Sequence, residues 1–191
     1  MSTEATELRS GADQRVARAP ILVTGPHRGG TTWVGRTLAL APGTKYCHEP
    51  FNPNVDDGVR FHRVRVPYWF MYIDETNESD WIDQVDCAMN GRAARGSLIA
   101  SLQSLRGARS WTGDFRRALL SKFHRGRVVV KDPFAVFSSK WLAKRYGMNV
   151  IIMIRHPAAF VASVVRKGWL FDFNNFLQQD RLMSRFLDPL R

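Results

Sequence analysis

The chain of 191 residues is long enough for one domain with a sizeable core, and its 45% hydrophobic and 24% charged residues are ordinary for a globular protein. Its net charge of +11 is concentrated after residue 95, where 17 of the 28 Lys and Arg residues lie but only 5 of the 17 Asp and Glu residues. This excess predicts an anionic partner, either nucleic acid or a multiply phosphorylated small molecule, although a basic surface also serves general solubility.

The first part of the chain is predicted to pass from a polar tail into alternating strands and helices. Residues 1–19 contain no apolar segment typical of a secretory signal, so we expect a disordered tail. The apolar residues 21–25 predict a buried strand, and residues 31–43 predict a helix that stops at a Pro-Gly pair. Residues 44–50 predict a second, short strand.

The rest of the chain is predicted to contain an insertion, followed by further strands that alternate with helices. Residues 50–112 show no strong strand period, and we predict loops and helices there, inserted between core strands. Five further elements are expected: a strand at 127–133, a helix with a serine cap at 138–147, a strand at 149–155, a helix at 157–168 and a helix at 173–187. The apolar run at 149–155 predicts a central parallel strand. Strands alternating with helices predict an α/β fold with a parallel sheet.

Two global features restrict the location of the protein. Cys47 and Cys87 lack the spacing of a zinc site or a disulfide framework, which favours a reducing, cytoplasmic location. No apolar run reaches the roughly 18 residues that a membrane span needs. We therefore expect no membrane span.

The segment VTGPHRGGTTW joins the first predicted strand to the first predicted helix. It has the Gly-x4-Gly spacing of a phosphate-binding P-loop at Gly25 and Gly30, but Thr31 stands where a P-loop has Lys. Glycines let backbone N–H groups converge on an anion, and a helix N-terminus adds partial positive charge. With Arg28 and the hydroxyls of Thr31 and Thr32, the segment predicts an anion-binding turn; an ordinary strand-to-helix turn with a Thr cap is the alternative.

Further cations lie where later strands are predicted to end. Arg155 follows the strand NVIIMI, and Ser163 lies eight residues later on the next helix. Open α/β sheets bind ligands at the carboxyl ends of their strands, so Arg155 and Ser163 could hold a second phosphate group; an Arg at the sheet edge and a Ser on a helix face are the alternative. Lys131, at the end of another strand, is expected to contact an anion or to pair with Asp132 or another acid.

The segment YCHEPFNP places two candidate proton acceptors after the second predicted strand. Glu49 either pairs with a cation at this edge of the sheet or acts as a general base. His48 is the rival base, although a lone His is more often structural. Side chains alternate along a strand, which predicts that His48 and Glu49 point to opposite faces and that only one of them faces the site.

These four motifs, in this order, resemble the sulfotransferase family that uses 3′-phosphoadenosine 5′-phosphosulfate (PAPS), over about residues 20–170. The family's 5′-phosphosulfate loop runs roughly Pro-Lys/Arg-Ser-Gly-Thr-Thr-Trp, and this chain has PHRGGTTW, with one extra residue before Arg28 and Gly in place of Ser. The family's 3′-phosphate motif, an Arg after a strand and a Ser eight residues on, matches Arg155 and Ser163. The resemblance implies a P-loop NTPase-like, three-layer fold with a central parallel sheet flanked by helices.

The resemblance also implies which residues bind PAPS, and it implies no metal. Arg28 would stabilise charge on the bridging oxygen, while the backbone N–H groups and Thr hydroxyls of the loop would hold the 5′-phosphate. Trp33 matches the position whose ring stacks on adenine; a core residue of the helix is the alternative. The implied cofactor-binding set is Arg28, Gly29, Gly30, Thr31, Thr32, Trp33, Arg155 and Ser163.

The general base differs between branches of the family. Cytosolic-type members have a catalytic His two residues after the strand-end Lys, but Pro133 occupies that position here. Carbohydrate-type and many bacterial members resemble this chain at HEPFNP, which implies Glu49 as the base and Lys131 beside the reacting group. Family members extend further after the Ser helix, so residues 20–191 are expected to form a single domain that lacks the C-terminal part of the family fold.

The implied reaction is sulfuryl transfer from PAPS to a hydroxyl or amine acceptor, such as a carbohydrate or a small metabolite. Residues 50–112 would shape the acceptor site, where Trp69, Tyr72 and Trp81 could stack on a ring or could belong to the core. Three alternatives remain: a P-loop nucleotide kinase with Asp132 as its candidate Mg²⁺ ligand, a catalytically inactive PAP-binding module, and a nucleic-acid binder, for which no motif is recognisable. The expected partners are therefore PAPS or PAP and an acceptor.

Overall fold

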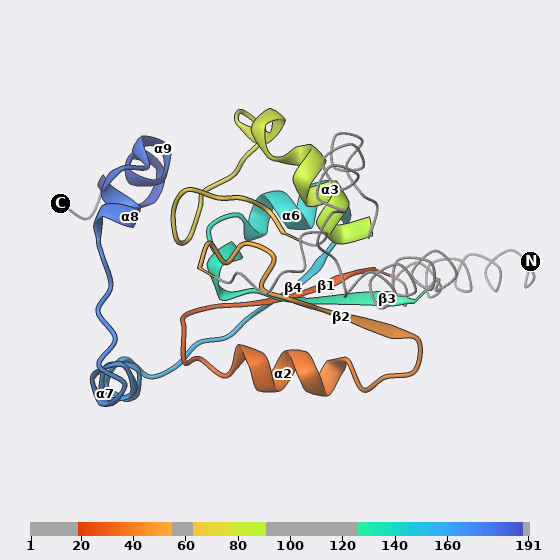
Figure 1. Cartoon of the computed structure of the whole chain (residues 1–191), viewed down its shortest axis with the longest axis horizontal. Coiled ribbons are helices and arrows are strands. Elements are labelled where there is room, and N and C mark those ends of the chain that lie inside the picture. The colour runs from red at the N-terminus through yellow and green to blue at the C-terminus, as the bar shows by residue number, and fades with distance from the viewer. Residues whose placement is uncertain (1–18, 55–62, 91–125, 189–191) are drawn as a thin grey trace, which may run out of the picture.

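The protein is built on one parallel β-sheet. The computed structural model describes residues 19–54, 63–90 and 126–188. Within these ranges the sheet has four strands in the order β2-β3-β1-β4 (Figure 1). The strands are β1 (Ile21–Thr24), β2 (Thr44–His48), β3 (Arg127–Lys131) and β4 (Asn149–Ile152). The predicted α/β fold with a parallel sheet is confirmed.

The register of the sheet brings the ends of all four strands to one edge. In the centre, Leu22 of β1 lies opposite Val130 of β3 on one side and Val150 of β4 on the other. On the outer side of β3, His48 of β2 lies opposite Lys131. Because the strands are parallel, the loops that follow them emerge together, and this edge is where open α/β sheets bind their ligands.

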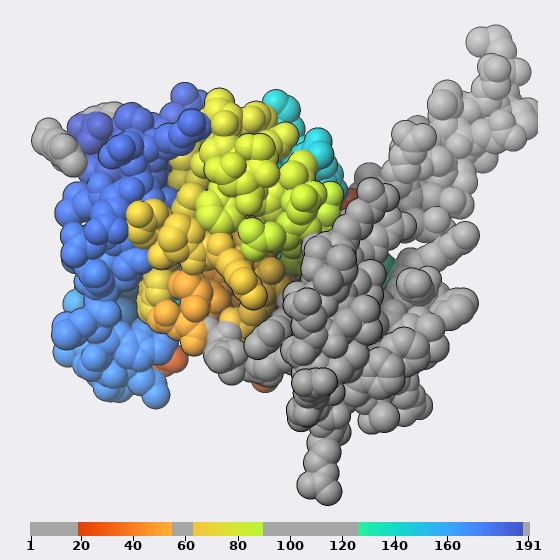
Figure 2. All heavy atoms as spheres, turned by 45° about the horizontal axis from the view of Figure 1, so that its top comes forward, coloured from red at the N-terminus to blue at the C-terminus, as the bar shows by residue number. Residues whose placement is uncertain are grey.

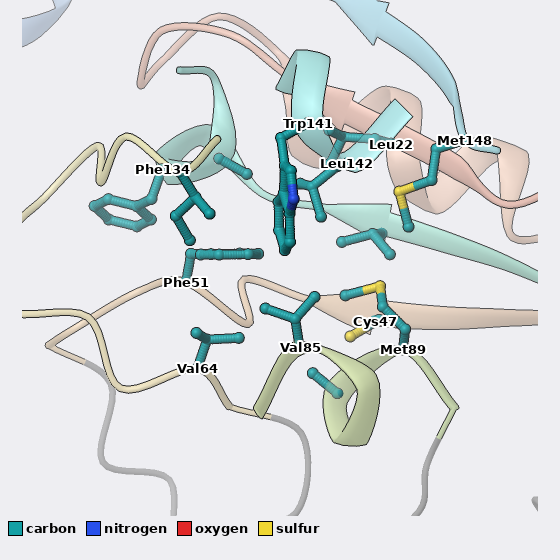
Figure 3. Packing of buried hydrophobic residues seen from close by; sticks show 14 of the residues in the cluster. Leu22, Cys47, Phe51, Val64, Val85, Met89, Phe134, Trp141, Leu142 and Met148 are labelled. Carbon is teal, nitrogen blue, oxygen red and sulfur yellow. The ribbon is translucent and has the colours of Figure 1, made fainter. Parts of the chain in front are cut away.

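Helices cover both faces of the sheet, as the three-layer prediction requires. The helix α2 (Thr31–Leu38) lies on one face, and α3 (Ile82–Asn90) and α6 (Ser139–Tyr146) lie on the other (Figure 1). The larger core fills the α3–α6 side with apolar side chains from both layers, among them Leu22, Phe51, Val85, Trp141 and Leu142 (Figure 3). A smaller core under α2 is formed by Ile21, Val23 and Val129.

The insertion after β2 contributes the 3-10 helix η2 (Glu78–Asp80) and α3, in agreement with the predicted mixture of loops and helices. Residues 55–62 and 91–112 of this prediction, and the tail 1–18, lie outside the described residues. None of the helices in the described part of the chain is long and apolar enough to cross a membrane.

The C-terminal helix predicted at 173–187 is wrong, because this segment forms three short helical pieces. After α7 (Pro157–Arg166) follow α8 (Asn174–Leu177), α9 (Asp180–Leu182) and the π-helical turn η5 (Met183–Leu187). The interruption comes at Gln179, whose buried side chain leaves the helical pattern to bind the segment after β2. Its Oε1 accepts from Tyr72 N at 2.9 Å, and its Nε2 donates to Asn175 O at 2.6 Å. Figure 2 shows the C-terminal residues (blue) lying against that segment (yellow).

Two further details differ from the sequence predictions. Within the described ranges β4 pairs only with β1, so it is an edge strand of this sheet and not a central one, and Ile152 at its end is 53% exposed. The apolar run at 149–155 therefore predicted a strand correctly, but it did not predict the position of that strand in the sheet. Ser138 precedes α6 but does not cap it, because its Oγ donates to Met71 O at 2.6 Å and accepts from Ile73 N at 3.1 Å. It fastens the insertion to the core instead.

Candidate active site

The glycine-rich loop after β1 is held in a conformation that its small residues permit. Gly25 has φ 134°, and a Cβ atom there would lie 2.4 Å from Met153 O of the loop after β4. Gly30 has φ 92° directly before α2. Gly29 N donates to Pro26 O at 3.0 Å, so this N–H group closes the turn in the structure. The converging donors are therefore those of Gly30 and the first turn of α2.

The first turn of α2 carries the predicted Thr-Thr-Trp sequence at the mouth of the loop. Thr31 is buried, Thr32 is half-buried, and Trp33 is 73% exposed. The N–H groups of these three residues have no partner within the helix, because the first turn of any α-helix lacks one. The exposure of Trp33 rules out the alternative that its ring is a core residue of the helix.

The structure brings Arg28, Arg155 and Ser163 into one cluster. Arg28 Nε donates to Ser163 Oγ at 3.0 Å, and Arg155 Nη1 donates to Arg28 O at 2.6 Å. Ser163 is buried on α7, whereas both guanidinium groups belong to exposed residues. The Arg28 guanidinium also lies 5.8 Å from the ring of Trp169, within the range of a cation–π contact. The two predicted phosphate-binding motifs are thus neighbours in space.

Glu49 and Lys131 form a largely buried ion pair at the ends of β2 and β3. Lys131 is 3% exposed, and its Nζ contacts Glu49 Oε1 directly. The other carboxylate oxygen, Oε2, accepts from Asn52 Nδ2 at 2.7 Å. Burial by itself would raise the pKa of Glu49, but the hydrogen bonds from Lys131 and Asn52 outweigh it and lower this pKa. Glu49 is therefore ionised near neutral pH.

The prediction that His48 and Glu49 point to opposite faces is wrong. His48 Nε2 lies 3.9 Å from Glu49 Oε1. The alternation fails because Glu49 leaves the strand conformation with φ 46°, in the left-handed region. His48 is the more exposed of the two, with 48% of its side chain accessible against 14% for Glu49.

His27, which the sequence analysis missed, lies in an aromatic enclosure beside the loop. Its ring centroid is 4.6 Å from that of Phe134, 5.2 Å from Phe70 and 5.5 Å from Trp69. Burial lowers the pKa of His27 to about 4, so the imidazole is neutral at pH 7. The available signal was that His27 is the extra residue of this loop relative to the family pattern.

Asp132 does not have the geometry of a metal ligand. It is fully buried, and its two oxygens accept from Phe51 N at 2.6 Å and from Phe134 N at 2.9 Å. Burial raises the pKa of Asp132 to about 7, against the opposing effect of these two N–H groups. The carboxylate that a kinase would need for Mg²⁺ is therefore used inside the fold.

A pocket of about 190 Å³ lies next to the aromatic enclosure. It is lined by Trp69, Leu170, Phe171, Asp172 and Asn175. Of the three aromatic residues considered for an acceptor site, Trp69 lines this pocket. The ring of Tyr72 instead packs 5.5 Å from that of Phe186, and Trp81 packs against the larger core.

A comparison with known families identifies one whose model matches this chain. The sequence model of the sulfotransferase family matches residues 20–187. No curated protein and no solved structure matches the chain. Because the family match covers most of the chain and both phosphate-binding motifs, the chain belongs to the sulfotransferase family, a family of PAPS-dependent transferases.

Proposed function

We propose that this protein transfers a sulfuryl group from PAPS to a hydroxyl or amine acceptor such as a carbohydrate or a small metabolite. The observation that carries the proposal is the cluster of Arg28, Arg155 and Ser163 at the mouth of the glycine-rich loop. These residues come from three separate segments of the chain and combine two cations with a hydroxyl group, which suits a ligand with two phosphate groups.

The loop has the features that a nucleotide phosphate needs. A side chain at Gly25 would collide with the loop after β4. Glycine at this position therefore lets the glycine-rich loop pack closely against that loop. N–H groups of Gly30 and the first turn of α2 would donate to the 5′-phosphate, with the hydroxyls of Thr31 and Thr32. The exposed ring of Trp33 is available to stack on adenine.

The 3′-phosphate would be bound by Arg155 and Ser163. Arg28 of the glycine-rich loop contacts both residues of this pair, since its side chain donates to Ser163 and its carbonyl accepts from Arg155. In the reaction Arg28 would stabilise the negative charge that develops on the leaving phosphate oxygen. PAPS supplies the sulfuryl group when it is bound.

The acceptor's proton is assigned to Glu49. The acceptor oxygen or nitrogen would bond to the sulfur of PAPS as the bond from sulfur to the phosphate oxygen broke with its electron pair remaining on PAP, and the Glu49 carboxylate would take up the acceptor's proton. Lys131 keeps this carboxylate ionised and in place, and is a second cation near the transferred group. Because the pKa of Glu49 is lowered, it would accept the proton after the forming bond to sulfur has made the acceptor more acidic.

The kinase alternative is disfavoured by the position of Asp132. Both of its oxygens accept hydrogen bonds from backbone N–H groups, and it is fully buried. A nucleotide kinase needs a carboxylate that reaches the metal beside the phosphates. Only a measurement of turnover distinguishes a catalytically inactive PAP-binding module from an enzyme.

The experiment is a transfer assay with [³⁵S]PAPS and a panel of sugars, phenols, aliphatic alcohols and amines. We expect radiolabel in an acceptor product together with stoichiometric PAP. Binding of PAP without transfer to any member of a broad panel would favour the inactive binding module. Transfer of phosphate from ATP-Mg²⁺ would favour the kinase.

A further inference from the structure

The carboxylate of Asp132 connects two segments that border the site. Its Oδ2 accepts from Phe51 N at 2.6 Å, and its Oδ1 accepts from Phe134 N at 2.9 Å. Phe51 N belongs to the turn that carries Glu49, which Asn52 N closes by donating to Glu49 O at 3.2 Å. Phe134 N belongs to the 3-10 helix η4 (Pro133–Ala135), where Asp132 is the N-cap residue.

The turn that Asp132 binds holds Glu49 in an unfavourable backbone conformation. Glu49 has φ 46°, which residues with a Cβ atom adopt rarely and retain only where surrounding bonds fix them. Besides the Asn52–Glu49 bond within the turn, two bonds tie it to the end of β3: Glu49 N donates to Lys131 O at 2.8 Å, and Phe51 N donates to Asp132. If Glu49 relaxed to extended backbone, its side chain would follow the strand alternation away from Lys131.

The second segment that Asp132 binds packs against the glycine-rich loop. Phe134 follows Asp132 by two residues, and its ring lies 4.6 Å from that of His27 in the glycine-rich loop. The rings of Phe51 and Phe134 are both anchored in the larger core (Figure 3). The carboxylate of Asp132 therefore links the turn at Glu49 to the segment that packs against the glycine-rich loop, and both are anchored in the larger core.

We propose that Asp132 is a positioning residue of the active site, which holds the Glu49 carboxylate against Lys131 by binding the N–H groups of Phe51 and Phe134. The proposal rests on the proposed function for its catalytic consequence, but the positioning itself is a property of the free protein. Asp132 does not contact substrate in this account. It acts through Glu49.

The charged and titratable groups that face Asp132 are few among the described residues. The charge of Glu49 opposes ionisation of Asp132, and the charge of Lys131 favours it. Cys47 on β2 also interacts with Asp132, and burial raises the pKa of this thiol to about 12, so it stays neutral. The effects of Glu49 and Lys131 on the pKa of Asp132 therefore oppose each other.

The test is Asp132→Asn, which keeps the shape but places an amide N–H₂ against one of the two backbone donors. We expect the pKa of Glu49, followed by ¹³C-carboxyl NMR, to rise towards its ordinary value. Amide exchange at Phe51 should accelerate about 10-fold. Affinity for PAP should not change, while kcat with the best acceptor of the [³⁵S]PAPS panel should fall about 100-fold, the effect of roughly 1 Å of misplacement.

The matched control is Asp86→Asn. Asp86 also accepts a hydrogen bond from a distant residue, Tyr146 Oη at 2.9 Å, but it joins α3 to α6 away from the strand ends. The Asp86→Asn variant should leave the pKa of Glu49 and the amide exchange of Phe51 unchanged. An unchanged Glu49 pKa and unchanged Phe51 exchange in Asp132→Asn would overturn the proposal.

Wild-type protein gives the same answer if Asp132→Asn does not fold. The carboxyl signal of Asp132 should titrate, and the signals of Glu49 Cδ and Phe51 N–H should shift in the same transition. Independent titration of these groups would overturn the proposal. A wild-type protein that fails to bind PAP or to transfer sulfate would instead contradict the proposed function, while the NMR result would still decide the role of Asp132.

Discussion

Arg28 Nε donates a hydrogen bond to Ser163 Oγ at 3.0 Å, which joins two residues 135 positions apart in the chain. The sequence assigned these residues to different phosphate groups of one ligand. In the structure they touch, and Arg155 is bonded to the carbonyl of Arg28 as well. The donors proposed for the two phosphates therefore form one network, and a change at one of them is expected to affect the other.

The first prediction concerns Ser163→Ala. Because Ser163 holds the Arg28 side chain, its loss should weaken binding of PAP and of adenosine 5′-phosphosulfate, which lacks the 3′-phosphate. We expect a loss of about 5-fold for adenosine 5′-phosphosulfate, the size of one ordinary hydrogen bond, and a larger loss for PAP, which also loses the contact of Ser163 with its 3′-phosphate. Isothermal titration calorimetry measures both affinities. A loss confined to PAP would mean that Ser163 serves the 3′-phosphate alone.

Arg155→Ala should behave differently. A charge-assisted contact to the 3′-phosphate is worth about 1.5–3 kcal/mol, so PAP should bind roughly 10–100-fold more weakly, and adenosine 5′-phosphosulfate should lose much less. Arg166→Ala removes an exposed cation in the last turn of α7, the helix that follows Arg155; it is the control for net charge and should leave both affinities unchanged. Equal losses for the two ligands would identify Arg155 as a support for the loop.

Glu49→Gln tests the assignment of the general base. The amide keeps the size of the side chain and an oxygen for Lys131, but it does not take up a proton. Sulfuryl transfer should fall by about 10²–10⁴-fold, while PAP affinity should hardly change. His48→Gln is the control, and we expect a much smaller effect because His48 lies further towards solvent. A larger loss in His48→Gln than in Glu49→Gln would transfer the role to His48.

The buried imidazole of His27 predicts a dependence of stability on pH. Burial lowers its pKa from about 6.5 to about 4 in the folded state, so unfolding takes up a proton between these values. The stability that His27 contributes is therefore present above pH 6.5 and is lost as the pH falls to 4. The difference in unfolding free energy between wild type and His27→Gln should fall by on the order of 2 kcal/mol over this interval in urea titrations. A constant difference would show that His27 is exposed to solvent.

Sequence patterns predicted the parallel sheet because buried strands and their Gly or Pro endings are local signals. Residues 21–25 and 127–133 became β1 and β3 with small shifts at their ends. The predicted helix at 173–187 failed because the buried side chain of Gln179 makes tertiary hydrogen bonds with Tyr72 N and Phe70 O that override the local helical pattern. The edge position of β4 could not be inferred either, since strand order depends on contacts distant in sequence.

For the site residues, too, some features were predictable from the sequence and others were not. Their location was predictable because parallel strands bring Glu49, Lys131 and Arg155 to one edge of the sheet. The ion pair of Glu49 and Lys131 was one of the alternatives, but the directions of the His48 and Glu49 side chains were predicted wrongly, because strand alternation assumes extended backbone and Glu49 has φ 46°. The roles of His27 and Asp132 depend on burial, which one residue in a sequence does not reveal.

The central claim is that the Arg28–Arg155–Ser163 cluster and the glycine-rich loop bind a nucleotide with two phosphate positions. The most direct measurement is calorimetric titration of the wild-type protein with PAP and with adenosine 5′-phosphate, each in excess EDTA. We predict that PAP binds without metal and roughly 10–100-fold more tightly than adenosine 5′-phosphate, because a 3′-phosphate adds charge-assisted contacts. No binding of PAP, binding that requires Mg²⁺, or equal affinity for the two nucleotides would contradict the account.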